Sequence, residues 1–206
     1  SVTFSDAGNK YGSFIIYYTK LAVLTDTLFV NCQASTDMAM IFNGKDDDSF
    51  ATFTNCTFLN CISRRYSVSI QKGNPTISNC TFTFTSNRNA CSGLEINQPN
   101  SVEITNCSFM NNNNKFLNSG SLFIHSNNKS PDKLTINGLL FSACIGSSYR
   151  TISVSFPSIK EDVLRIEKVH ILDISTGASI YGINVDKDVT FDHCVFKNNL
   201  FGNQLG

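Results

Sequence analysis

Four side chains near the C-terminus have residue types that could support acid–base or metal chemistry: Glu167, Asp192, His170 and His193. Glu167 and Asp192 occupy equivalent places in two similar segments, "LRIEKVHIL" and "VTFDHCVF", each with a nearby histidine. If these segments pair as strands, the carboxylates lie ~5 Å apart, the separation that a retaining glycosidase uses. The histidines could convert the same cluster into a metal site. No feature of the sequence indicates a pocket there, so we expect a solvated acidic pair, with no catalytic residue, metal or cofactor.

A second acidic group is the run Lys45-Asp46-Asp47-Asp48. Adjacent carboxylates attract calcium, but the run lacks the alternate spacing of a chelating loop, so we expect a solvated turn. His125 ends the apolar segment "LFI" and is expected to be structural.

The eight cysteines would suit the disulfide framework of a small secreted protein. A chain of 206 residues can build its own apolar core, however, and no cysteine pair has the spacing of a zinc site. We therefore expect buried free thiols. A bridge between Cys32 and Cys61 stays open, because both fall where strands are expected to end.

A short motif recurs along the chain, written "TNCTF", "SNCTF" and "TNCSF". Less exact copies extend the series to about seven repeats of about 28 residues. Their anchor positions are Phe29, Phe58, Phe82, Phe109, Phe141, Ile171 and Phe196. A second alternating segment follows most copies, as in "YSVSIQ" and "GSLFIH". Both segments have the period of a strand, and none has the period of a helix.

The asparagine of the motif marks a bend. In "TISNCTF", Ile77 and Phe82 are an odd number of residues apart, so one residue must interrupt the alternation before both can point inward. Asparagine, aspartate and glycine tolerate the left-handed conformation that such a bend needs. The predicted bend column is Asp26, Asn55, Asn79, Asn106 and Gly138. Lys168 and His193 fit this conformation less well, so the last two repeats are expected to bend differently.

With that bend, each repeat turns a cysteine or aliphatic residue and an aromatic ring into the core. The predicted core columns are Phe29, Phe58, Phe82, Phe109, Phe141 and Phe196, together with Cys56, Cys80, Cys107 and Cys194. Each unit is too small to bury its own apolar face, so the units must stack and share one core. The sequence predicts an all-β, single-stranded, right-handed parallel β-helix of about seven coils. We expect one such domain over residues 1–206, as a fragment of a longer chain.

The motifs "FMNN" at Phe109–Asn112 and "FKNN" at Phe196–Asn199 resemble half of the repeat in chlamydial polymorphic outer-membrane proteins. "SGSLFI" at 119–124 and "TGASIY" at 176–181 resemble the other half, although no intact GGAI occurs. Similar degenerate repeats are found in large surface proteins of protists. The resemblance implies a surface-exposed or secreted, adhesin-like β-helix, and it implies no catalytic residues.

The same fold also carries pectate lyases, polygalacturonases and phage tailspikes, but their catalytic motifs are absent in that form. Outward threonines could form a flat binding array, although charged residues interrupt it and cross-strand pairing explains them without a ligand. Among the sequons, Asn128 in the loop "HSNNKSPDK" is the expected glycosylation site, because the others occupy the bend column.

The charge balance excludes a basic nucleic-acid surface, since 16 basic and 16 acidic residues are dispersed along the chain. No apolar run is long enough for a membrane span. We therefore expect a non-catalytic structural or adhesive segment of an extracellular or cell-surface protein or fibre, with a glycan or a cell-surface protein as partner. Two alternatives stay open: a polysaccharide-acting lyase, hydrolase or tailspike-like domain, and a subunit that self-associates end to end or laterally.

Overall fold

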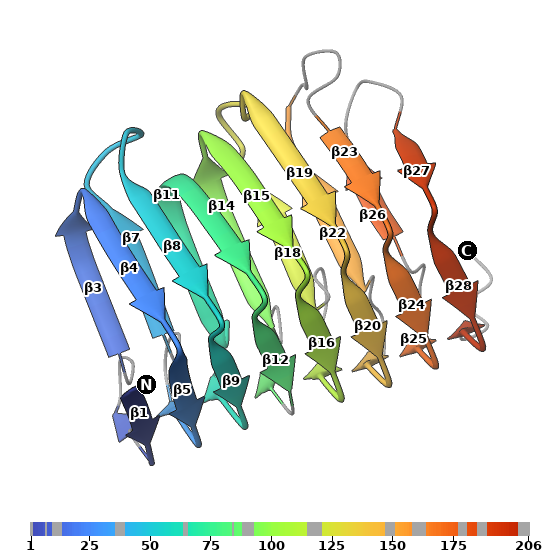
Figure 1. Ribbon diagram of the computed structural model, residues 1–206, viewed down its shortest axis with the longest axis horizontal. Coiled ribbons are helices and arrows are strands. Elements are labelled where there is room, and N and C mark those ends of the chain that lie inside the picture. The colour runs from blue at the N-terminus through green and yellow to red at the C-terminus, as the bar shows by residue number, and fades with distance from the viewer. Residues whose placement is uncertain are drawn as a thin grey trace.

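A computed structural model describes residues 2–6, 8–9, 14–35, 40–63, 66–83, 85–87, 93–114, 121–146, 151–157, 164–176, 181–184 and 189–201. All elements in these ranges are strands, and every strand pairing is parallel. The chain therefore winds as a β-solenoid, with successive coils side by side along the long axis (Figure 1).

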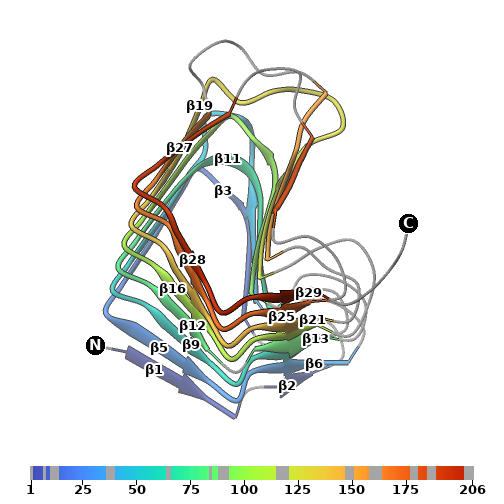
Figure 2. The same ribbon diagram turned by 90° about the vertical axis from the view of Figure 1, so that its right-hand side faces the viewer.

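Four sheets run along the solenoid, and Figure 2, which looks along the stack, shows them enclosing one interior. Sheet A has eight strands: β1 (Val2–Ser5), β5 (Thr27–Val30), β9 (Thr57–Leu59), β12 (Thr81–Thr83), β16 (Ser108–Met110), β20 (Leu140–Ser142), β24 (His170–Leu172) and β28 (Val195–Lys197). Sheet B is built from pairs of residues: β2 (Gly8–Asn9), β6 (Gln33–Ala34), β10 (Ile62–Ser63), β13 (Ser86–Asn87), β17 (Asn113–Asn114), β21 (Ile145–Gly146), β25 (Ser175–Thr176) and β29 (Leu200–Phe201).

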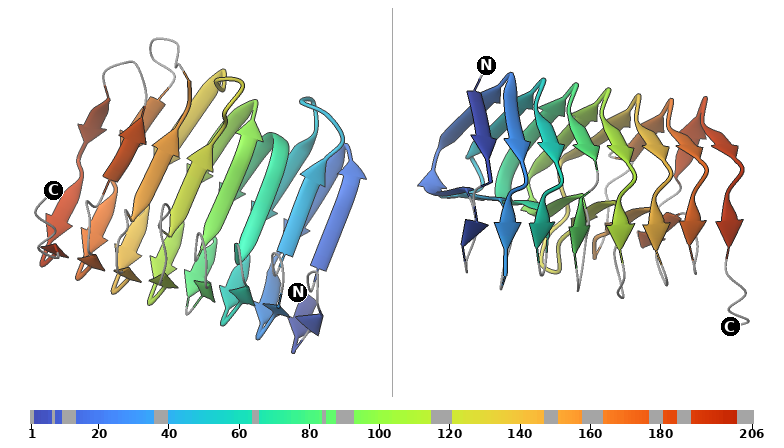
Figure 3. Two further views of the ribbon diagram at one scale, coloured as in Figure 1. Left: turned by 180° about the vertical axis from the view of Figure 1, so that it is seen from behind. Right: turned by 90° about the horizontal axis from the view of Figure 1, so that it is seen from below.

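Sheets C and D are joined by the long strand β11 (Val68–Ser78), which belongs to both. Sheet C, which is seen from behind in the left panel of Figure 3, also contains β3 (Phe14–Thr19), β7 (Met40–Gly44), β14 (Leu94–Pro99), β18 (Leu122–His125), β22 (Ile152–Ser155) and β26 (Tyr181–Asn184). Sheet D also contains β4 (Leu21–Thr25), β8 (Phe50–Thr54), β15 (Ser101–Thr105), β19 (Lys133–Asn137), β23 (Leu164–Glu167) and β27 (Thr190–Asp192). The predicted fold class, an all-β parallel solenoid, is confirmed.

The number of repeats differs from the prediction, because sheet A has eight strands where the sequence indicated about seven copies. The additional copy is β1, where Phe4 pairs in register with Phe29. Its segment, "VTFSDAG", lacks the asparagine and cysteine that identify the other copies.

The core is organised in columns of like side chains. Six phenylalanine rings, from Phe4 to Phe141, stack from coil to coil with centroids 4.7–5.2 Å apart and planes within 10° of parallel. Stacked pairs of this kind stabilise by about 0.5–1.5 kcal/mol beyond the burial of the rings. Phe196 differs from the prediction, because its side chain is 48% exposed. It lies on β28, which has a neighbouring strand on one side only within the described sheet.

The chain turns sharply between sheets D and A. Asn55, Asn79 and Asn106 each have φ between 52° and 54°, and Gly138 has φ of 67°. Lys168 and His193 have φ of 50° and 51°, so the expectation that the last two repeats bend differently was wrong. The strand pairing on both sides of the bend requires the same backbone path in every coil, and it overrides the weaker preference of lysine and histidine.

Candidate functional site

The structure places Glu167 and Asp192 side by side on the outer face of sheet D, in register on β23 and β27. They lie in a depression with a volume of about 380 Å³, which corrects the expectation that no pocket would accompany them. Its lining residues are Leu164, Arg165, Ile166, Glu167, Thr190 and Asp192.

Both carboxylate oxygens of Glu167 are already engaged. Arg165 Nε donates to Oε1 at 2.5 Å, and Asn137 Nδ2 donates to Oε2 at 3.1 Å. Both oxygens therefore act as acceptors to neighbouring side chains of the protein. The contacts of Glu167 are therefore those of a structural ion pair.

The two histidines do not complete a site. His193 Nδ1 lies 2.6 Å from Asp192 Oδ1, but both side chains are more than half exposed. His170 lies beyond the bend, on the outer face of sheet A, and does not line the depression. Within the described part of the chain, no cluster of three or more histidine, cysteine or acidic residues could hold a metal ion.

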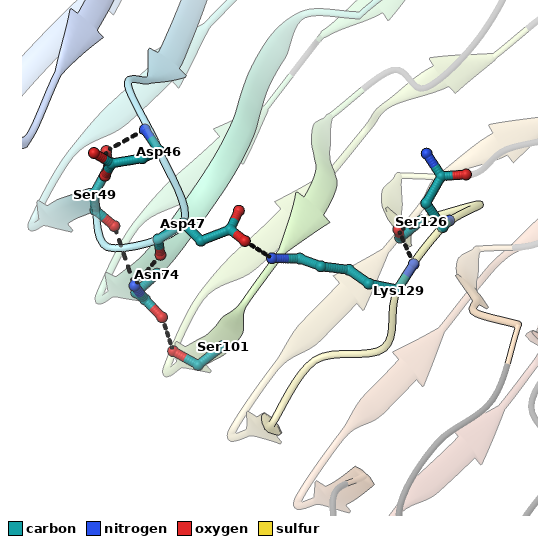
Figure 4. Close-up of polar contacts among 8 residues, drawn as sticks. Asp46, Asp47, Ser49, Asn74, Ser101, Ser126 and Lys129 are labelled. Atoms are coloured by element: carbon teal, nitrogen blue, oxygen red, sulfur yellow. Dashed lines mark hydrogen bonds and ion pairs between the residues drawn. The ribbon is translucent and has the colours of Figure 1, made fainter.

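The acidic run at 45–48 forms a turn that is tied to the neighbouring coils (Figure 4). Asp46 pairs with Lys20 at 3.3 Å, and Asp47 pairs with Lys129 at 2.8 Å. Asn74 Nδ2 donates to the Asp47 carbonyl at 2.8 Å, while Asn74 Oδ1 accepts from Ser101 at 2.8 Å. Lysine ammonium groups therefore neutralise two of the three carboxylates. The run forms a surface turn, as expected, with Asp47 and Asp48 exposed.

The cysteines in the described ranges are all free, and Cys91 lies outside those ranges. Cys32 and Cys61 are therefore not bridged. Cys56, Cys80 and Cys107 are buried in one inward column, whereas Cys194 is only half-buried because it lies in the last described coil.

Thiol contacts within the column alter acidity. A hydrogen bond with the Cys80 thiol raises the pKa of Cys56 and lowers that of Cys107. The thiol of Cys107 raises the pKa of Cys80 to about 12. Hydrogen bonding to Cys32 and burial likewise raise the pKa of Cys61. Thiols with raised pKa are poor nucleophiles and poor metal ligands.

Asn128 is exposed in the loop before β19, where its backbone nitrogen donates to Ser126 Oγ at 3.3 Å. At the bend sequons, the side-chain nitrogen that would carry a sugar can be engaged in the protein, since Asn55 Nδ2 donates to Asp26 at 3.0 Å. Glycosylation at Asn128 stays a prediction.

A second bend column, which was not predicted from the sequence, lies between sheets A and B. Asp6, Asn31, Asn60, Asn111, Ala143, Asp173 and Asn198 all have φ between 51° and 56°. Some of these side chains bond from coil to coil: Asn31 donates to Asp6 at 2.9 Å, and Asn60 donates to Asn31 at 2.7 Å. The signal was present in "FMNN" and "FKNN", where Asn111 and Asn198 are the bend residues.

A buried acid on the outside of sheet C was also missed. Glu95 is only 2% exposed, and it accepts from Ser69 Oγ at 2.6 Å. Its other oxygen lies 2.9 Å from His125 Nε2. His125 therefore has a structural partner, as expected of a lone histidine, but the partner could not be identified before the register of β14 and β18 was known.

The family described as "right handed beta helix region" matches residues 39–205. A search of curated proteins found no match, and a search of solved structures found none either. No helix in the described part of the chain is long and apolar enough to cross a membrane. Because the family match covers most of its length and agrees with the parallel solenoid, the chain belongs to the right-handed β-helix family.

Proposed function

We propose that this chain is a non-catalytic, structural or adhesive β-helix of an extracellular or cell-surface protein. The observation that carries the proposal is the engagement of Glu167, whose two oxygens are held by Arg165 and Asn137 in the depression on sheet D. The acidic pair is held in surface ion pairs, Glu167 with Arg165 and Asp192 with His193.

The free thiols are compatible with an external location, because Cys56 and Cys80 are buried and burial protects a thiol from oxidants. The adhesin-like character rests on the repeat resemblance at "FMNN" and "FKNN". A glycan on Asn128 would be compatible with its exposure.

An activity assay tests the non-catalytic part. The domain is incubated with neutral and acidic polysaccharides, and new reducing ends or unsaturated products are measured for the parent protein and for the Glu167→Ala/Asp192→Ala double variant. We expect no product from either. Product released by the parent and lost in the double variant would establish the polysaccharide-acting alternative, which the depression beside Asp192 favours.

Surface staining tests the location. Antibodies raised against the folded domain should label intact, unpermeabilised source cells or their culture medium. Labelling confined to permeabilised cells would contradict the proposal.

A further inference from the structure

The outer surface of the first two coils is apolar where the chain turns from sheet C to sheet D. Five large side chains there are 51–75% exposed: Tyr17, Tyr18, Leu21, Val23 and Phe50. They lie on β3, β4 and the adjacent β8, at the N-terminal end of the stack (Figure 1). We call these five residues the corner patch.

Strand register and ring contacts connect the members of the corner patch. Leu21 and Phe50 are direct cross-strand partners, and Val23 lies on the same side of β4 as Leu21 because side chains alternate along a strand. The rings of Tyr17 and Tyr18 lie 6.0 Å apart, at the end of sheet C. Two residues separate Tyr18 from Leu21 along the chain. The patch therefore wraps one corner of the solenoid.

The columns that contain the corner patch become polar in the later coils. The column of Val23 continues through hydroxyl and acidic residues: Thr52, Thr76, Glu103 and Thr135. Tyr17 pairs with Asn43, and Phe50 pairs on its other side with Asn74. Polar residues thus serve the strands equally well at these outward positions. Packing within the solenoid does not account for the apolar residues of the first coils, and exposed patches of this kind mark interaction surfaces.

The size of the corner patch matches the apolar centre of a dimer interface. An aromatic side chain offers about 150–250 Å², so the exposed parts of the three rings and two aliphatic side chains amount to about 500–600 Å². A standard interface takes about 800 Å² from each partner, and about 65% of a homodimer interface is apolar. The patch therefore supplies the apolar area that one partner needs.

The charges around the corner patch favour a second copy of the chain over a charged partner. Lys20 lies between the tyrosines and Leu21, and it pairs with Asp46 at 3.3 Å. Lys45, Asp47 and Asp48 are exposed in the adjoining turn. Because lysines and aspartates nearly balance, this rim gives an anionic surface no net attraction. The chain has 16 basic and 16 acidic residues, so two copies do not repel each other through net charge.

We propose that the corner patch is the interface of a two-fold symmetric homodimer, in which the outer corners of two solenoids meet side by side. A two-fold axis lets one apolar patch cover its own copy, so the assembly closes at two chains. Leu21, Val23 and Phe50 form its apolar centre, and the two tyrosines add rings whose hydroxyls can reach water at the rim. The contact uses outward side chains and is distinct from pairing through the strands of the last coil. It goes beyond the proposed adhesive function and does not depend on it.

Sedimentation equilibrium of the 206-residue chain tests the assembly. We expect the mass to rise with concentration and to stop at two chains, with a dissociation constant that does not increase when salt is raised, because the contact is mainly apolar. A monomer at ~100 µM protein would overturn the proposal, since interfaces of this size have micromolar or tighter affinity. Mass that grows beyond two chains would also overturn it and would indicate end-to-end assembly.

A double variant tests the surface. Leu21→Ser/Phe50→Asn introduces the residue types that the same column carries at Asn74 and Ser101, so the strands are retained. Circular dichroism and the unfolding midpoint verify that the fold is unchanged. The dissociation constant of the dimer should rise about a hundredfold or more, because central apolar residues carry most of the binding energy and each substitution occurs on both sides of the axis.

The matched control is Ile145→Ser/Leu200→Ser, which removes two exposed apolar side chains from sheet B. Its dimer should dissociate within about threefold of the parent concentration, since hot-spot residues lie inside an interface and not elsewhere. A control that dissociates as readily as Leu21→Ser/Phe50→Asn would show that the corner patch is not the interface.

Chemical crosslinking tests the side-by-side geometry. Val23→Cys and Thr135→Cys place a thiol in the same outward column, four coils apart, in a Cys194→Ala background. A short bis-maleimide should join two chains of the Val23→Cys protein and leave the Thr135→Cys protein and the background protein uncrosslinked. Any other pattern contradicts the placement of the two-fold axis at the patch.

A lipid surface is the competing occupant of the corner patch. Vesicles of phosphatidylcholine, with and without phosphatidylserine, are sedimented with the parent protein and with Leu21→Ser/Phe50→Asn. We expect neither protein to sediment with either vesicle. Sedimentation of a monomeric parent that is lost in the double variant would assign the patch to a membrane and reject the dimer.

Discussion

Asparagine has three distinct roles in this chain, and each uses a different property of the side chain. At Asn55 it occupies the left-handed region and bonds to the preceding rung at Asp26. At Asn112 it points into the core, where its Oδ1 accepts from Thr85 and its Nδ2 donates to the Phe82 carbonyl at 3.2 Å. At Asn97 the amide lies half-buried on the outer face of sheet C, with no hydrogen-bond partner among the described residues. Residue type alone therefore does not reveal the role, whereas position in the coil does.

The phenylalanine column gives the first prediction. Phe82→Ala should lower the free energy of unfolding by about 3–5 kcal/mol, because it removes a fully buried ring with stacked neighbours on both sides. Phe196→Ala is the matched control, and its smaller effect follows from the 48% exposure of that ring. Urea unfolding monitored by circular dichroism measures both. Similar losses for the two variants would refute the central role of the stack.

The buried thiols give a prediction on reactivity. Near pH 8, iodoacetamide should modify the half-exposed Cys194 while Cys56 and Cys80 stay unmodified until urea is added, as read by peptide mass spectrometry. Modification of Cys80 at the rate of Cys194 in the folded protein would be inconsistent with this burial.

The same thiols predict a dependence of stability on pH. The pKa of Cys80 is about 12 in the folded protein against an ordinary value of 9.0, so above pH 9 the unfolded chain loses a proton that the folded chain keeps. The stabilisation that the Cys80 thiol gives to the folded state is complete below pH 9 and falls as the pH rises toward 12. Urea titrations across this range should show the fall. The fall in the free energy of unfolding should be smaller in Cys80→Ala. An equal fall in that variant would show that groups other than Cys80 cause the pH dependence.

At the scale of the element, the strands and the bend between sheets D and A followed from local rules, whereas the contacts of the candidate sites did not. Ile77, Cys80 and Phe82 could be assigned to the interior because a period of two with one interruption admits one arrangement. The pairing of Glu167 with Asp192 also followed once the repeats were aligned. Glu95 and His125 are 30 residues apart and carry no motif, so only the registered sheet brings them together.

The bends give a prediction on backbone strain. Lys168 has φ of 50°, where a non-glycine side chain other than asparagine or aspartate costs about 1–2 kcal/mol. Lys168→Asn should therefore raise the free energy of unfolding by about 0.5–1 kcal/mol. Lys168→Ala, which keeps the strain, serves as the control in urea unfolding and should give no such gain. Equal stabilities of the two variants would show that backbone strain at residue 168 does not lower the free energy of unfolding.

At the scale of the whole molecule, stability is expected to vary along the axis, because each coil contacts mainly its two neighbours. The central strands pair with a neighbouring strand on both sides, whereas all three residues of β27 and of β28 are exposed. Hydrogen exchange should therefore be slowest in β11, β12, β15 and β16 and fastest in β27 and β28. Uniform exchange along the axis would indicate a single cooperative unit instead.

The exposed last coil also bears on self-association. Leu200 is 70% exposed and Phe196 is 48% exposed, and within the described residues their strands pair with a neighbour on one side, an arrangement that favours pairing with another chain. Sedimentation at increasing protein concentration distinguishes an end-to-end assembly, which grows with concentration, from a monomer, which does not.

The bonds between bend residues all point the same way. In each case the amide nitrogen of the later coil donates to the oxygen of the earlier one, from Asn31 to Asp6, from Asn55 to Asp26 and from Asn198 to Asp173. The earliest described rung of each column is an aspartate, which can only accept. Hydrogen-bond donation between bend side chains therefore runs in one direction along the solenoid, from each later coil to the coil before it. The same rule accounts for Asp173, because the bend residue of the coil before it is Ala143, which has no side-chain oxygen to accept a bond, so a side chain that cannot donate loses nothing there.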